Sequence, residues 1–260
     1  MNKICLFYTS NLTNKIIYYE LIKEYPSFFN EVIEFPISNS INQKIVHKIK
    51  KSGLKFIFFQ FLINFYFKFL NNIFGVKIKN LCKKKNIKYS FQKKIDKKLI
   101  NKLRKKKYDF IFNGQNTILK KNILNNKVAK FINCHCAPLP NFRGPANYIW
   151  LILKKSMCYP TIHVIDETID GGEIIDYGKK VSYKKFKSVF SLWYEMRLSS
   201  RLCIKKNIEF FLGQKKSSKI KLNTKNIIRT FPKKKEINKI NIPFLTWGNL
   251  IYLIAIPFKD

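Results

Sequence analysis

The sequence predicts an α/β protein in three layers, with a mostly parallel, twisted sheet covered by helices on both faces. Two observations predict this class. Short apolar segments alternate with longer segments whose apolar residues recur at helical spacing. A hydrophobic content of 46% over 260 residues is enough to bury a sizeable core. In a parallel sheet, ligands bind beyond the carboxyl ends of the strands, so functional residues are expected there.

The first half of the predicted sheet begins near the N-terminus. Lys3–Tyr8 is expected as a buried strand, because this short apolar run is followed by turn residues. Leu12–Tyr25 has helical spacing, and Glu31–Phe35 is expected as the second strand. Gln43–Asn80 is expected to be helical, with interruptions near its two glycines.

The remaining elements continue the alternation of helix and strand. Asp96–Lys107 is expected as a basic helix, because its apolar residues lie four apart. A long amphipathic helix is expected over Phe186–Leu212, and Gly213 fits its C-terminal stop. The further expected strands are Asp109–Phe112, Lys130–Cys136 and Pro160–Ile165.

Charge is the unusual feature of the composition. Lys and Arg total 51 against 15 Asp and Glu, which gives a formal net charge of +36. Only five of the basic residues are Arg, whereas proteins that read phosphates or bases favour Arg for its bidentate fork. We therefore interpret most of the charge as compositional drift. Such a surface still attracts anionic partners, including nucleic acid and anionic membranes.

Cysteine usage and hydropathy bear on the compartment. The six cysteines are scattered through apolar stretches, which is typical of reduced thiols in a cytoplasm. No signal-peptide pattern is visible at the N-terminus. The most hydrophobic run, Phe56–Phe67, is shorter than the roughly 20 residues of a membrane-spanning helix, so we expect an amphipathic or buried helix. The expected location is cytoplasmic.

The stretch that carries chemistry begins at the end of the strand Lys130–Cys136. Alternate side chains of a strand share a face, so Asn133 and His135 point one way and Cys134 points the other. An amide and an imidazole at a strand's carboxyl end make a polar site, although a hydrogen-bonded core histidine would fit the same pattern. Zinc is not expected, because adjacent residues on opposite faces cannot ligate one ion and no C-x-x-C occurs.

An acidic turn follows the strand Pro160–Ile165. It ends in Asp170 and two glycines, which permit a tight backbone. Taken alone, this turn fits a solvated loop as well as a functional one.

Together these segments resemble the catalytic domain of the folate-dependent formyltransferases, which pass a formyl group from 10-formyltetrahydrofolate to an amine. The family pattern is Asn-x-His, Leu-Pro, Arg-Gly and then T-I-H-x-x-D-E-x-x-D-x-G-x-I-I. It is matched at Asn133–His135, Leu139-Pro140, Arg143-Gly144 and Thr161–Ile175, in that order. The resemblance implies a Rossmann-like formyltransferase fold over residues 1–213.

The resemblance also implies roles for individual residues. Asn133, His135 and Asp170 fall on the family's catalytic triad. Asn133 would donate to the oxyanion that forms when an amine attacks the formyl carbon, and His135 would stabilise charge or move the amine proton. Asp170 would orient His135 and support its cationic form. This chemistry needs no metal.

The resemblance further implies where folate and acceptor bind. Two segments match the walls of the family's pterin pocket: Gly114, Gln115, Asn116, Thr117, Ile118 and Leu119 on one side, and Asp166, Glu167, Thr168 and Ile169 on the other. The acceptor's anionic end would lie near Ser10 and Asn11. Arg143 matches the Arg-Gly position, where its role is either acceptor binding or structural.

Three acceptors fit such an enzyme: a nucleotide-linked amino sugar, initiator methionyl-tRNA, and glycinamide ribonucleotide. The tRNA enzymes carry a C-terminal β-barrel, whereas the basic extension at 214–260 has little strand pattern. Its Arg229–Lys235 segment is similar to a segment found after the catalytic domain in many sugar formyltransferases, and an insertion at about 36–95 argues against the compact purine enzyme. We therefore expect the amino sugar, with tRNA as the alternative. A non-catalytic relative associated with RNA or with an anionic membrane stays open.

Overall fold

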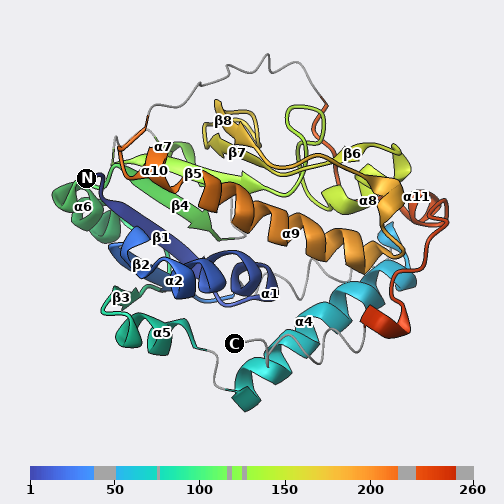
Figure 1. Cartoon of the computed structure of the whole chain (residues 1–260), viewed down its shortest axis with the longest axis horizontal. Helices are drawn as coiled ribbons and strands as arrows, with labels where there is room; N and C mark the ends of the chain where they lie inside the picture. Colours follow the sequence, from blue (N-terminus) through green and yellow to red (C-terminus); the bar gives the residue numbers. More distant parts are fainter. Residues whose placement is uncertain (38–50, 75–76, 116–118, 125–127, 216–226, 250–260) are drawn as a thin grey trace.

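A computed structural model describes residues 1–37, 51–74, 77–115, 119–124, 128–215 and 227–249 (Figure 1). Seven strands form the main sheet in the order β3-β2-β1-β4-β5-β7-β8. These strands are β1 (Ile4–Thr9), β2 (Glu31–Phe35), β3 (Lys88–Phe91), β4 (Phe110–Gly114), β5 (Lys130–His135), β7 (Thr161–Val164) and β8 (Ile174–Tyr177). Strands β6 (Met157–Cys158) and β9 (Val181–Ser182) pair separately.

The main sheet is mostly parallel, as the sequence predicts. β1 to β5 pair in parallel, and β7 and β8 add an antiparallel edge. The helices are α1 (Leu12–Asn14), η1 (Lys15–Tyr19), α2 (Glu20–Glu24), η2 (Pro26–Phe28), α4 (Leu54–Phe74), α5 (Ile78–Lys84), α6 (Lys97–Lys106), α7 (Lys121–Leu124), α8 (Asn147–Leu153), η3 (Tyr183–Lys185), α9 (Val189–Lys206), α10 (Ile208–Phe211) and α11 (Lys234–Ile237).

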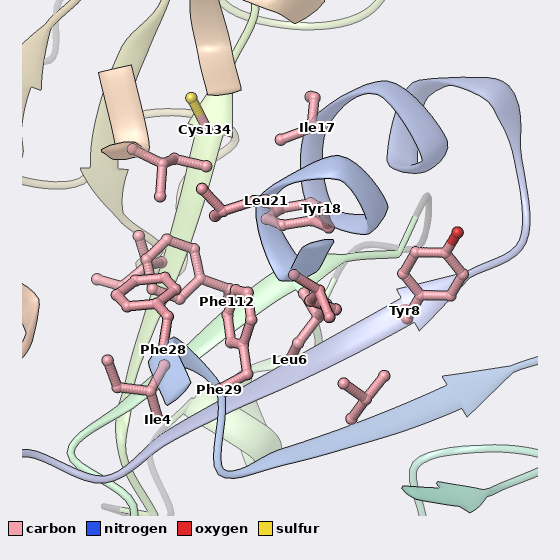
Figure 2. Close-up of a cluster of buried hydrophobic side chains, with 14 of the residues drawn as sticks. Ile4, Leu6, Tyr8, Ile17, Tyr18, Leu21, Phe28, Phe29, Phe112 and Cys134 are labelled. Carbon is pink, nitrogen blue, oxygen red and sulfur yellow. The ribbon is translucent and has the colours of Figure 1, made fainter. Parts of the chain in front are cut away.

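One face of the sheet packs against η1, α2, α9 and α10. Leu6 of β1 and Phe112 of β4 are fully buried there, together with Phe28, Phe29 and Phe211. Figure 2 shows side chains from the strands meeting those of η1 and α2 in this cluster. The aromatic rings pack mostly edge to face, an arrangement that their quadrupoles favour.

The opposite face of the sheet packs against α6 and α7. Cys5 and Phe7 of β1 alternate with the residues that point to the first face, and they meet Leu99 and Leu103 of α6. A third apolar cluster joins α4, α8 and the N-terminal half of α9 beside the sheet. The three layers and the fold class expected from the sequence are confirmed.

The structure corrects several boundaries. β3 lies inside the range 36–95 that the sequence suggests as an insertion, yet it is an edge strand of the main sheet and pairs with β2. The helix expected over Phe186–Leu212 starts only at Val189, where Ser188 caps it, and it breaks at Asn207 into α9 and α10. Within Gln43–Asn80, α4 begins directly after Gly53, which has a positive φ of 79°. Residues 43–50 and Gly75 lie outside the described ranges.

The described part of the C-terminal extension packs onto the domain that contains the main sheet. The Arg229 N–H donates to the Arg143 carbonyl at 2.9 Å, and the indole of Trp150 in α8 donates to Thr230. Ile237 of α11 is buried in the third cluster. Residues 227–249 are therefore an arm of the domain. None of the helices in the described ranges has the length and apolar character that crossing a bilayer requires.

Candidate active site

Asn133 and His135 occupy the carboxyl end of β5, where the sequence places them. Ile132 and Cys134 alternate with them and are buried in the first core cluster, on the other face. His135 is only 6% exposed, whereas Asn133 is half-buried. The strand thus presents an amide and an imidazole side by side at the edge of the sheet.

The hydrogen bonds of His135 determine which ring nitrogen carries its proton. Nε2 lies 2.8 Å from the Phe142 carbonyl oxygen, an acceptor, so Nε2–H is the donor. Nδ1 then faces Asp170, whose Oδ1 is 3.5 Å away. The side-chain amide of Asn147 lies 3.1 Å from Nε2.

Asp170 is held in a strained backbone conformation. Its φ is 49°, in the left-handed region that costs energy for residues other than glycine. Two contacts from the loop after β5 secure it: the Gly144 N–H donates to the Asp170 carboxylate at 2.8 Å, and Arg143 Nε donates to the Ile169 carbonyl at 2.7 Å. A Cβ on Gly172 would lie 1.9 Å from the Val164 carbonyl oxygen, so only glycine allows the turn to close.

The electrostatic environment favours the charged form of Asp170. Burial alone would raise the pKa of this carboxyl, but the facing His135 and the Gly144 N–H together lower it below its ordinary value of 3.8. His163 and Arg143 act in the same direction. An ionised carboxylate therefore stands opposite Nδ1 of His135.

A second histidine completes the site. His163 lies opposite Asn133 on the neighbouring strand β7, and its Nε2 is 3.2 Å from the Asn133 amide nitrogen. Its Nδ1 is 2.9 Å from the Val164 carbonyl, so Nδ1 carries the proton and Nε2 accepts from Asn133. Burial, aided by the nearby His135, lowers the pKa of His163 from 6.5 to about 4, which keeps the ring neutral.

The loops after β1 and β4 lie beside each other. The Asn14 side chain donates to the carbonyls of Thr9 and Gly114 and so ties the ends of these strands together. Asn11 caps α1 through its side-chain oxygen and leaves its buried amide nitrogen without a hydrogen bond. Ser10 is half-exposed at the same turn.

The two segments expected to hold the pterin are joined by an ion pair. Lys121, just after the first segment, contacts Glu167 at 2.8 Å. Leu119 is buried in the cluster that also contacts Ile165, and the Asp166 carboxylate accepts from the backbone and hydroxyl of Thr168. Asn116, Thr117 and Ile118 lie outside the described ranges. The structure thus brings the described parts of the two segments close to each other.

Three residues that sequence reasoning missed contribute to the site: Asn14, Asn147 and His163. His163 could have been found, because the strand pairing that aligns two polar side chains follows from alternation on neighbouring strands. Asn147 gave no such signal, since its contact depends on the path of the loop after β5. Arg143, expected near the acceptor, is 3% exposed and holds the turn before Asp170. No group of His, Cys, Asp and Glu suited to a metal ion occurs in the parts of the chain that the structure describes.

Comparison with known proteins finds a family that resembles part of the chain. Residues 75–182, which include the Asn133–His135–Asp170 constellation, match the family described as formyl transferase. Within residues 75–182, therefore, the chain is similar to formyl transferases. No curated protein is similar enough to the chain to match it.

Solved structures of formyltransferases share the fold of this domain. A 4-N formyltransferase from Francisella tularensis is 22% identical, with a TM-score of 0.56 over 88% of this chain and 76% of its own. An N-formyltransferase from Helicobacter canadensis is 18% identical, with a TM-score of 0.55 over 88% and 71%. A phosphoribosylglycinamide formyltransferase from Anaplasma phagocytophilum is 16% identical, with a TM-score of 0.57 over 82% and 88%.

The neutral state of His163 predicts a pH dependence of stability. Its pKa is about 4 in the folded protein and near 6.5 when unfolded, so between these values the unfolded chain binds more protons. The free energy of unfolding should therefore rise from pH 4 to 6.5, with His163 contributing about 3 kcal/mol of the rise. Chemical denaturation across this range should give a flatter profile for His163→Gln. Parallel profiles for the two proteins would contradict a neutral His163.

Proposed function

We propose that the chain transfers a formyl group from 10-formyltetrahydrofolate to the amino group of a nucleotide-linked amino sugar. The observation that carries this proposal is the arrangement of Asn133, His135 and Asp170 at the carboxyl edge of the sheet, within the part of the chain that is similar to formyl transferases. The expected roles of these residues fit their geometry. The two segments linked by Lys121 and Glu167 are the proposed walls of the folate pocket.

The proposed reaction is direct attack of the amine nitrogen on the formyl carbon. A C–N bond forms to the acceptor, negative charge builds on the formyl oxygen, and the C–N bond to tetrahydrofolate then breaks. His163 accepts one N–H of the Asn133 amide, which leaves the other to donate to the developing oxyanion. His135 and the ionised Asp170 beside it stabilise the charge that develops, and the proton that the attacking amine loses passes to the leaving tetrahydrofolate nitrogen.

The solved structures support an amino-sugar acceptor as the finer proposal. The Helicobacter canadensis enzyme was solved in complex with folinic acid and dTDP-3-aminofucose. Within the described part of the extension, 227–249, the chain forms a single bridge and the short helix α11, both packed against the domain. Methionyl-tRNA is the alternative acceptor. The six cysteines, which all lie in described parts, are free, and this supports a cytoplasmic location.

Removing the functional group of either His135 or Asp170 should lower the chemical rate. His135→Ala and Asp170→Asn should each reduce kcat by about 10²–10⁴-fold with a much smaller change in KM, because they act on charge that develops in the transition state. Steady-state kinetics of tetrahydrofolate release would measure both constants. Asp109→Asn is the control, since Asp109 lies before β4, at the opposite end of the sheet, where its carboxylate accepts from the Lys3 N–H. Wild-type turnover in either site variant would remove these residues from the chemistry.

The acceptor can be identified by comparing the formylation of two candidate acceptors under the same conditions. The protein should formylate a nucleotide-linked amino sugar at about 0.15 M salt and leave initiator methionyl-tRNA unmodified. Mass spectrometry of each acceptor would detect a formyl-sized gain after incubation with 10-formyltetrahydrofolate. Any tRNA binding should be indifferent to the attached methionine and should weaken steeply with salt, because only the phosphate backbone is contacted. Efficient, methionine-dependent formylation of the tRNA would instead assign that acceptor.

A further inference from the structure

Helix α4 has two apolar faces. Its inner face carries Phe56, Phe59 and Ile63, which are at most 4% exposed. The Phe59 ring lies 6.2 Å from Tyr148 of α8 and 5.3 Å from Phe244 of the C-terminal arm. Figure 1 shows this helix at the rim of the molecule, away from the main sheet. The inner face attaches α4 to the domain through these contacts.

The outer face of α4 is a stripe of large apolar side chains. Leu54, Phe58, Phe61 and Phe65 are 78, 63, 57 and 55% exposed. They recur at intervals of four, three and four residues, which places them on one side of an α-helix. The rings of Phe61 and Phe65 stack at a centroid distance of 5.4 Å. Four exposed large side chains in one line are unusual on a monomeric surface and mark an interaction site.

Exposed lysines gather where the stripe begins. Ser52 donates through its hydroxyl to the Pro232 carbonyl at 2.7 Å, and a Cβ on Gly53 would lie 3.2 Å from Lys234. The start of α11 is therefore in contact with the start of α4, as Figure 1 also shows. The exposed lysines brought together here are Lys51, Lys55, Lys233, Lys234 and Lys235.

We propose that the outer face of α4 docks on an anionic lipid bilayer, with the helix lying in the plane of the interface. An aromatic stripe that can enter the acyl boundary, next to lysines that can contact anionic headgroups, is the chemistry of an interfacial helix. Charge complementarity selects this occupant. A net charge of +36 and five clustered lysines oppose contact between two copies of the chain, whereas they attract an anionic surface.

Vesicle sedimentation with the full chain tests this surface. We expect the protein to pellet with vesicles of phosphatidylcholine containing about one-third phosphatidylserine and to stay in the supernatant with pure phosphatidylcholine. Raising the salt from about 0.15 M to about 1 M should weaken the binding, because the lysine–headgroup attraction is screened.

Double variants test whether vesicle binding depends on the stripe and on these lysines, or is non-specific. Phe58→Gln with Phe61→Gln, or Lys55→Gln with Lys235→Gln, should each lower vesicle binding by about tenfold or more. Matched controls remove exposed side chains elsewhere: Leu202→Gln with Phe91→Gln, and Lys97→Gln with Lys98→Gln on α6. The controls should bind as the wild type does. Circular dichroism would confirm that every variant is folded.

Three results would overturn the proposal. One is equal binding to vesicles with and without phosphatidylserine. Another is unchanged binding of the Phe58→Gln/Phe61→Gln variant. The third is that the wild-type chain does not bind vesicles but sediments as a dimer, and that the Phe58→Gln/Phe61→Gln variant is a monomer. The stripe would then be an interface between two copies of the chain. None of these outcomes depends on the proposed formyl transfer, since no residue of the stripe lies in the active site.

Discussion

The burial of one carboxylate organises the candidate active site of this protein. A carboxylate taken out of water must be hydrogen-bonded and paired, or it will take up a proton. Asp170 meets this requirement through the Gly144 N–H and the facing ring of His135, and these partners come from different segments. The requirement draws three segments together: the end of β5, the loop that follows it, and the turn after β7. The same requirement explains why Asp170 is kept in a left-handed backbone conformation that would otherwise be costly.

The loop after β5 transmits this constraint to the rest of the molecule. Arg143 bonds to the turn before Asp170 with its side chain, and its carbonyl accepts from Arg229 in the C-terminal arm. The neighbouring Gly144 has a φ of 97°, and a Cβ there would lie 2.1 Å from the Arg229 carbonyl oxygen. The arm, the loop and the turn that holds Asp170 therefore pack as one unit. On the other side, the neutral ring of His163 accepts from the Asn133 amide, while His135 on the neighbouring strand faces the Asp170 carboxylate.

Much of this arrangement could be predicted from the sequence, for local reasons. Buried strands such as Glu31–Phe35 are marked by short apolar runs, and the shared face of Asn133 and His135 follows from strand alternation. β3 was missed because Lys88–Phe91 is an edge strand with half-exposed and exposed residues, which gives no apolar run. The contacts of Asn147 and Arg143 depend on how a long loop returns to the strand, and no local pattern encodes that path. The role of α11 beside α4 likewise arises from contacts between residues about 180 positions apart.

The central claim is that Asp170 is ionised and acts as a unit with His135. Carbon-13 NMR of side-chain-labelled aspartate would measure it directly, with Asp170→Asn used to assign the resonance. We predict that the Asp170 carboxyl titrates below its ordinary pKa of 3.8 in the wild type. In His135→Asn the charge partner is gone, so burial should move the pKa of Asp170 upward. A wild-type Asp170 that titrates above its ordinary value, with no response to the loss of His135, would contradict the account.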